Sequence, residues 1–536
     1  MHPKLRSHRP LIMGRRGAVA TNHPVATQAG LDVLRAGGNA VDATVAVSLT
    51  LGVVEPHMSG LGGDGFWQVH SARGVAACVN GTGAAPLAAT PERYRDGIPV
   101  QGPLSASTPG LLAGLALLHK EFGSMDWARL CAPAIEAARD GFAATHHYRH
   151  FSGEQRAALG RDARARAIFL GPDGDAPVLG HIVAQPELAA TLEAIARDGA
   201  EGFYRGALAK RLAAGIAAAG GLVAEADLAA CAAERQEPIR IPFQGGFEVR
   251  QTPPNSTGFT MLQILRIIDR FDLKAMGWNS AELIHLMVEA KKRAFLDREA
   301  HGRDPRFADI PLDWLLSEAR AAEHAAAIRL DRAASLPVRP MPESDTTYFC
   351  VVDGAGNAVS AIQSINSNFG ACVVAGDTGV LLNNRMAYWH LQEGHANRLV
   401  PGRRVRHTMN APMLFRDGRF WAVLGTPGAD NQVQINAQVA VSMAVFGLDP
   451  QQALEAPRWT SSQPGQAANY PHAGDATLTL EAGLADTALA LQAKGHQVKV
   501  VPPLEGPCSV EAIRLLENGV RMAGSDPRRD GWAAAF

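Results

Sequence analysis

The chain has 536 residues, of which 47% are hydrophobic and 19% are charged, and this composition is that of an ordinary globular protein. Lys and Arg number 51 and Asp and Glu 52, so no basic field is available to bind a phosphate backbone, and we expect no nucleic-acid partner. The longest apolar run, residues 43–54, is too short to cross a bilayer, which takes ~20 residues. No secretory signal is visible, and we expect a cytoplasmic location without a membrane partner.

Three segments predict helices from their periodicity and their flanking residues. Residues 28–54 predict two helices divided by a glycine pair, and the second is apolar nearly all round and therefore buried. Residues 186–199 predict a helix that starts at a proline and ends before a glycine. Residues 279–301 predict a long helix whose first turn holds a capping box of Asn279 and Glu282.

Short segments rich in β-branched and aromatic residues predict strands between these helices. They are bounded by Gly, Pro, Asp or Asn, and they cover residues 66–70, 247–252, 346–352, 358–365 and 419–425. Helices and strands therefore come in mixed runs rather than in strict alternation. This order favours an α+β layered sandwich over a doubly wound parallel sheet.

Neither a metal ion nor a cofactor is expected. The six cysteines are scattered without a CxxC pair, which argues against zinc and predicts reduced, mostly buried thiols. Residues 60–65, GLGGDG, have the spacing of a dinucleotide-binding loop, but a helix leads into them and a strand leaves them. That motif requires the opposite order, so a glycine turn is the better interpretation, although the turn could also line a substrate pocket.

A hairpin at residues 346–365 places hydroxyl groups together. If Val352 pairs with Ala358 across the loop, Thr346 lies opposite Ser364, with Cβ atoms ~5 Å apart. Asn366 then points to the same face, because strand side chains alternate. A threonine hydroxyl needs a base to act as a nucleophile, and a free α-amine on the same residue can supply one. The competing interpretation is that threonines simply begin a strand, where they are favoured.

Several blocks of the sequence together resemble the γ-glutamyltransferase family. They occur in the family's order over nearly the whole length, at residues 21–66, 105–110, 253–259, 345–370, 379–386, 401–404 and 425–430. The resemblance implies an N-terminal-nucleophile hydrolase with a four-layer αββα sandwich. It also implies a precursor that cuts itself between Asp345 and Thr346 into a large chain, 1–345, and a small chain, 346–536.

The same resemblance implies catalytic roles at matching positions. Thr346 would be the nucleophile, and Ser364 stands where the family has a threonine that hydrogen bonds to it. Asn366 matches an asparagine that orients the site or the substrate. Gly428 and Ala429 occupy the place of a glycine pair whose backbone N–H groups form the oxyanion hole. The partners implied are a small-molecule amide and the two processed chains as a heterodimer, which could dimerise again.

The positions that would grip the acyl group depart from the family pattern. Pro91 replaces the arginine that holds a glutamyl α-carboxylate, with Arg93 and Arg95 nearby but not aligned. Tyr388 stands in the segment where the family has the acidic residue that holds the α-amine, preceded by an alanine. An α-ammonium bound without a carboxylate costs several kcal/mol, so we expect an acyl group that lacks this amine.

Further departures lie near residue 407. His407 and Thr408 stand where the family has two serines before a methionine, and Arg403 and Arg404 lie just before them. These two arginines and His407, together with the two near residue 91, are a candidate carboxylate site, although each one by itself is more often a solvated surface charge. A small carboxylate-bearing amide, as in oxamate-hydrolysing relatives, or an acylase-type substrate would fit.

Two other functions remain open at this point. One is a γ-glutamyl transferase or hydrolase that acts on glutathione-type amides through residues outside the family pattern. The other is an inactive homologue with a binding role, which the retained Thr346, Ser364 and Asn366 make the weakest of the three interpretations.

Overall fold

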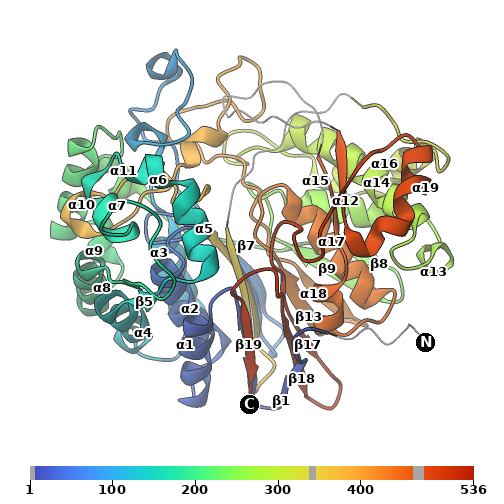
Figure 1. Cartoon of the computed structure of the whole chain (residues 1–536), viewed down its shortest axis with the longest axis horizontal. Coiled ribbons are helices and arrows are strands. Elements are labelled where there is room, and N and C mark those ends of the chain that lie inside the picture. The colour runs from blue at the N-terminus through green and yellow to red at the C-terminus, as the bar shows by residue number, and fades with distance from the viewer. Residues whose placement is uncertain (1–6, 337–345, 463–475) are drawn as a thin grey trace.

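Two sheets packed face to face between two layers of helices form the centre of the protein (Figure 1). The computed structural model describes residues 7–336, 346–462 and 476–536. Helices from the first half of the chain cover one outer face, at the left of Figure 1, and helices after residue 257 cover the other. This is the αββα sandwich, and the α+β prediction is confirmed.

The first sheet carries the nucleophile candidate. It has seven antiparallel strands in the order β19 (Trp532–Ala535), β2 (Gly17–Thr21), β10 (Thr347–Asp353), β11 (Ala358–Ser364), β3 (Asp64–His70), β4 (Ala76–Gly81) and β7 (Glu234–Gln236). The sheet therefore combines strands from before and after residue 346, with β2 lying between β19 and β10. Every residue of β10 and β11 is buried, because a helix layer covers one face and the second sheet covers the other.

The second sheet also has seven antiparallel strands. Their order is β1 (Ile12–Gly14), β18 (Arg521–Ser525), β17 (Glu511–Leu515), β13 (Arg419–Gly425), β12 (Met413–Arg416), β9 (Phe247–Gln251) and β8 (Ile239–Phe243). Two small sheets lie outside this pair, formed by β14 (Trp459–Ser461), β15 (Thr477–Glu481) and β16 (Gln497–Val501), and by β5 (Phe142–Ala143) and β6 (Ile182–Val183).

The helices of the first half of the chain lie on the side of the first sheet. They are α1 (Pro24–Arg35), α2 (Ala40–Val54), α3 (Leu111–Phe122), α4 (Trp127–Asp140), α5 (His146–Glu154), α6 (Arg156–Leu159), α7 (Ala163–Phe169), α8 (Pro186–Asp198), α9 (Glu201–Tyr204), α10 (Ala207–Ala218) and α11 (Glu225–Ala230). Every residue of α2 is buried, and Asn39 caps the helix by accepting from the backbone N–H groups of Val41 and Asp42. The predicted pair of helices divided by glycines is thus confirmed.

The other helical layer packs on the second sheet. It contains α12 (Gly258–Ile268), α13 (Leu273–Met276), α14 (Ala281–His301), α15 (Leu312–Leu315), α16 (Glu318–Ala326), α17 (Asn431–Ala444), α18 (Pro450–Glu455) and α19 (Ala488–Ala493). The capping box predicted at Asn279 is wrong. Ser280 is the N-cap and accepts from the N–H of Leu283, whereas Asn279 has φ +54° and turns the chain into the helix.

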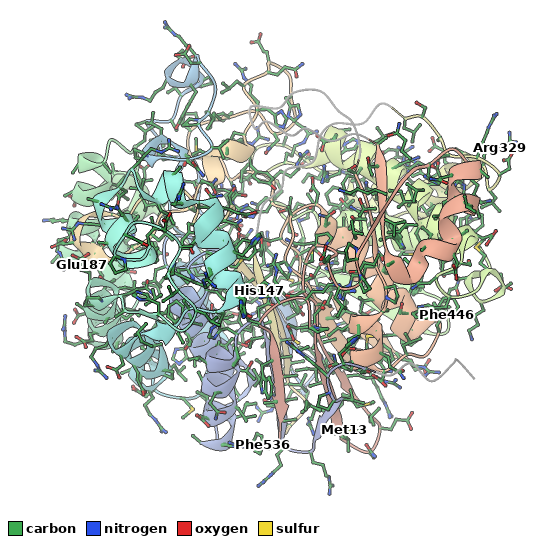
Figure 2. The ribbon with its side chains drawn as sticks, viewed as in Figure 1. Met13, His147, Glu187, Arg329, Phe446 and Phe536 are labelled. Atoms are coloured by element: carbon green, nitrogen blue, oxygen red, sulfur yellow. The ribbon has the colours of Figure 1, made fainter. Side chains whose placement is uncertain are left out.

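The two sheets bury a separate hydrophobic core between them. Its members come from both sheets and include Phe66, Tyr348, Ile362, Met413 and Ile513. Glu187 and Arg329 mark the two outer helical sides in Figure 2, and Met13 and Phe536 mark one end of the sheets. None of the helices in the described residues is long and apolar enough to cross a membrane.

Candidate active site

Thr346 lies at the start of β10, where the hairpin register sets its partner. Val352 pairs with Ala358 and Thr347 pairs with Gln363, as the sequence predicts. The Thr346 hydroxyl therefore reaches Ser364 and donates to its Oγ at 3.3 Å. The loop that fixes this register is closed by Asp353, whose Oδ1 accepts from the backbone N–H of Ala355 at 2.9 Å and of Asn357 at 3.0 Å.

The two adjacent threonines point to opposite faces of the sheet. Thr346 lies on the face of Tyr348, in the layer between the two sheets, and is 1% exposed. Thr347 lies on the helix side, where its hydroxyl donates to Oε2 of Glu55 at 2.6 Å. The two hydroxyls thus have different surroundings, because only that of Thr346 faces the space between the sheets.

A chain of hydrogen bonds continues from Ser364. Its Oγ accepts from the backbone N–H of Asn366 at 2.7 Å. Asn366 has φ +86°, a conformation that asparagine adopts more readily than most residues, and its Nδ2 donates to the carbonyl of Asn384 at 3.2 Å. Its Oδ1 accepts from Nη1 of Arg385 at 3.0 Å. One hydrogen-bond chain therefore connects Thr346, Ser364, Asn366 and Arg385, in that order.

The turn after β13 presents free backbone N–H groups. β13 ends at Gly425, where an added Cβ would lie 2.2 Å from the Tyr348 ring, so the turn begins beside β10. Gly428 has φ +112° and Ala429 has φ +49°. Within the described part of the chain neither N–H has a hydrogen-bond acceptor, and both precede the N-terminus of α17. Free donors at a helix N-terminus suit a developing negative charge.

Buried ion pairs connect the turn at Gly428 and Ala429 to α14. Asp430 pairs with Arg298, and Arg298 also contacts Glu299 at 2.7 Å. Arg406 contacts the same Glu299 at 3.1 Å, and all four side chains are at least mostly buried. Burial works to raise the pKa of Glu299, but Arg406 and Arg298 together hold it well below its usual range. The turn is thus fixed to α14 by buried ion pairs.

A second cluster lies beyond Asn366 and consists of Asp64, Arg385 and His407. Asp64 Oδ1 accepts from the N–H of Gly83 at 2.8 Å. Its Oδ2 lies 3.3 Å from Nε of Arg385 and 3.3 Å from Nε2 of His407. Burial, followed by the positive charge of Arg385, lowers the pKa of His407 to about 4. His407 is therefore uncharged near neutral pH and adds no positive charge to the site.

Arg385 is the site residue that the sequence analysis missed. Its side chain is 1% exposed, and Nη2 has no hydrogen-bond partner in the described residues. The signal in the sequence is a charged residue inside residues 379–386, a segment that is otherwise apolar or amide-bearing. Tyr388 follows one turn later in the 3-10 helix Arg385–Tyr388, with its ring 5.6 Å from the guanidinium carbon of Arg385.

The other arginines of the candidate carboxylate site have different surroundings. Arg93 and Arg95 are exposed, at the 3-10 helix Pro91–Tyr94. Arg404 is buried but pairs with Glu234 at 2.8 Å, and Arg403 donates to the carbonyl of Ala396 at 3.0 Å. These guanidinium groups therefore face either solvent or internal partners, and a carboxylate site built from them stays a prediction.

Two remaining expectations have simple outcomes. Thr408 is 3% exposed, and its hydroxyl has no partner among the described residues. Asp345, on the other side of the expected cut, lies outside the described residues. Five of the six cysteines are buried, and Cys231 is partly exposed.

One group of side chains in the described part of the chain has metal-ligand spacing. Ligand atoms of His285, Glu289 and His496 lie within 4.8 Å of one another. His285 Nδ1 and His496 Nε2 are already hydrogen bonded at 2.8 Å. Glu289 accepts from Lys292 at 2.7 Å and from Arg293 at 2.9 Å, and these two cations oppose a metal ion. We therefore assign no metal to this cluster.

The fold and the site define a class. Two sheets between helical layers, with a threonine at the start of a central strand and free N–H groups beside it, are those of an N-terminal-nucleophile hydrolase. The comparisons with known proteins agree. The structure matches that of a cephalosporin acylase from Bacillus halodurans with a TM-score of 0.90 and 32% identity, covering 100% of this chain and 98% of that chain.

Sequence comparison gives the family. The gamma-glutamyltranspeptidase model matches residues 26–536. The chain is 38% identical to the glutathione hydrolase-like YwrD proenzyme of Bacillus subtilis, covering 98% of this chain and 99% of that protein. It is 36% identical to the oxamate amidohydrolase proenzyme of Klebsiella pneumoniae, covering 97% and 98%. The chain belongs to the gamma-glutamyltranspeptidase family and is an amidohydrolase of that family.

Proposed function

We propose that the chain is a proenzyme that cuts itself between Asp345 and Thr346 and then hydrolyses the amide bond of a small carboxylate-bearing substrate. The contact between the hydroxyls of Thr346 and Ser364 supports this proposal, because it holds the Thr346 hydroxyl in place. After the cut, the new N-terminus would carry its amine beside this hydroxyl and could act as its base. Two relatives named as proenzymes, which align over nearly their whole lengths, support the processing step.

The sheet topology explains how a cut enzyme would hold together. In the first sheet β10 and β19 of the small chain both pair with β2 of the large chain, and β11 pairs with β3. In the second sheet β12 pairs with β9, and β18 pairs with β1. Because both sheets contain strands of both chains, cleavage would leave a heterodimer held by these five strand pairings.

The geometry supports a two-step reaction at Thr346. Oγ1 forms a bond to the amide carbon while the α-amine accepts the hydroxyl proton. The carbonyl oxygen becomes negative and accepts from the N–H groups of Gly428 and Ala429. The C–N bond then breaks as the same amine returns the proton to the leaving nitrogen. Water repeats the sequence on the acyl-enzyme, which releases the acid and restores Thr346.

The choice of substrate rests on the charged groups that surround the acyl side of the site. Ala387 and Tyr388 offer no carboxylate, and the carboxylate of Asp64 is already shared by Arg385, His407 and a backbone N–H. A substrate ammonium in such a site would lack a counter-charge, and removing one partner of a buried ion pair commonly costs ~3–5 kcal/mol. An acyl group without an α-amine, either oxamate-like or of the acylase type, fits better.

Mass spectrometry and two substrates test this proposal. Two masses that match a break before Thr346 are expected from purified protein. Processed enzyme is then incubated separately with oxamate and with γ-glutamyl-p-nitroanilide, and release of ammonia or nitroaniline is followed. Faster turnover of oxamate is the expected result, and efficient turnover of the γ-glutamyl compound would contradict the choice of substrate.

A γ-glutamyl hydrolase or transferase is the second candidate, favoured by the similarity to a glutathione hydrolase-like proenzyme. Transfer of the γ-glutamyl group to an added amine, rather than to water, would identify the transferase. The third candidate, an inactive binding protein, predicts a single uncut chain.

A further inference from the structure

We infer that Arg385 binds the negatively charged end of the substrate's acyl group through Nη2. The inference rests on the proposed amidohydrolase function and names the group that would select its substrate. The three nitrogen atoms of the Arg385 guanidinium group have different surroundings. Nε faces Asp64, Nη1 donates to Asn366, and Nη2 has no partner in the described part of the protein.

An unpartnered donor of this kind is costly in a buried place. The Arg385 side chain is 1% exposed, and a buried N–H of a charged group without an acceptor loses its hydrogen bond to water without gaining another. Burial lowers the pKa of Arg385 below its usual value, but an arginine stays protonated near neutral pH. A ligand that supplies an anionic oxygen would remove this cost.

Asp64 does not fully neutralise the guanidinium. Its nearest approach to Nε is 3.3 Å, which is longer than the ~2.7–2.9 Å of a close charge-assisted hydrogen bond. The same oxygen also faces His407, and the other oxygen accepts from Gly83. Paired arginines elsewhere in the core are closer to their carboxylates, as at Arg404 and Glu234, 2.8 Å apart. Arg385 thus keeps positive charge available for a second anion.

The hydrogen-bond chain from Arg385 to the Thr346 hydroxyl limits the size of the ligand. Only Ser364 and Asn366 separate Arg385 from the Thr346 hydroxyl along the hydrogen-bond chain. This chain limits the separation of the two residues, so we take a substrate with its amide carbon at Thr346 and its carboxylate at Arg385 to be a small one. Monoamides of small dicarboxylic acids, such as oxamate, malonamate and succinamate, have this form.

The test compares substrates that differ only in charge. Processed wild type and Arg385→Gln are assayed for ammonia release from oxamate and from oxamide, in which a carboxamide replaces the carboxylate. The ratio of kcat/KM for oxamate to that for oxamide is expected to fall about 10- to 100-fold in Arg385→Gln, mainly through KM for oxamate. Arg385→Lys keeps the charge and is expected to restore part of this ratio. An equal loss on both substrates, through kcat, would show that Arg385 only positions Asn366 and would overturn the inference.

Direct binding separates failure of this inference from failure of the proposed function. Calorimetry measures binding of oxalate, malonate and succinate to the processed protein. At least one is expected to bind wild type and to bind Arg385→Gln about 10-fold more weakly, even if oxamate proves not to be a substrate. Binding that is the same in both proteins, or absent from wild type, would overturn the inference.

Two controls guard against a folding defect. Asp64→Asn combined with Arg385→Gln removes both charges, so no buried carboxylate is left alone, and it is expected to lose anion binding like the single variant. Arg320→Gln removes another arginine that is paired with a buried carboxylate, that of Asp297 on α14. It is expected to leave the substrate ratio unchanged.

Discussion

The two sides of the active site are held in place in different ways. On the nucleophile side, strand register places Thr346 opposite Ser364, and a turn before a helix N-terminus presents the N–H groups of Gly428 and Ala429. On the acyl side, Arg385 and His407 are carried by a one-turn helix and by a loop, and they meet at Asp64. In the proposed reaction, backbone geometry thus positions the reacting groups, whereas side-chain charge selects the substrate.

Removing the hydroxyl of Thr346 tests the nucleophile side most strongly. Thr346→Ala is expected to stay a single chain and to lose at least ~10⁴-fold in activity, because both self-cleavage and acyl transfer need Oγ1. Thr346→Ser keeps a hydroxyl and should still be cut. A denaturing gel, intact mass and the amide assay measure the outcome. An active, uncut Thr346→Ala protein would mean that another residue is the nucleophile.

Adding a methyl group at Gly428 should disturb the oxyanion turn next most strongly. The new Cβ would lie 2.0 Å from Sγ of Cys508, and φ of +112° is unfavourable for alanine. We expect Gly428→Ala to lower kcat by ~10²–10³, the usual cost of one oxyanion donor, with a smaller change in KM.

Ala429→Gly is the matched control, because it relieves a left-handed alanine and keeps both N–H groups. It should retain activity and alter stability by about 1 kcal/mol or less. If the two variants behaved alike, the turn would not be the oxyanion site.

The neutral His407 makes the stability of the protein depend on pH. Its pKa is about 4 in the folded protein, against 6.5 ordinarily, so the unfolded chain binds more protons between these values. The free energy of unfolding therefore falls as pH drops from 6.5 to 4, by up to ~3 kcal/mol from this residue. Above pH 6.5 its contribution is fully present.

His407→Gln should make the pH dependence of stability shallower in this window. The comparison uses calorimetric melting of the uncut Thr346→Ala protein with and without His407→Gln, so that chain separation does not intervene. Parallel pH dependences would show that His407 titrates in the folded protein as it does in the unfolded chain, so that it becomes charged below about pH 6.5 and could then attract an anion.

Sequence reasoning succeeded where local pattern determines structure. Residues 419–425 are strand β13, and the hairpin register follows from a loop closed by Asp353. It failed where long-range packing decides. Arg404 pairs with Glu234, far away in the sequence. Asp64 begins β3 directly after a glycine turn that pattern alone could only describe as a possible pocket lining, and its contact with Arg385 bridges 321 residues.

The exposed arginines should matter least, and they sharpen the contrast between the two sides. Arg93 and Arg95 are exposed, and surface charges contribute little to binding or stability because water and salt screen them. Arg93→Ala and Arg95→Ala, alone or together, are expected to change kcat/KM for oxamate less than about twofold at 0.15 M salt. A loss greater than tenfold, absent at high salt, would mean that these residues attract the substrate from solution. Anion recognition would then begin at the surface, before the carboxylate reaches Arg385.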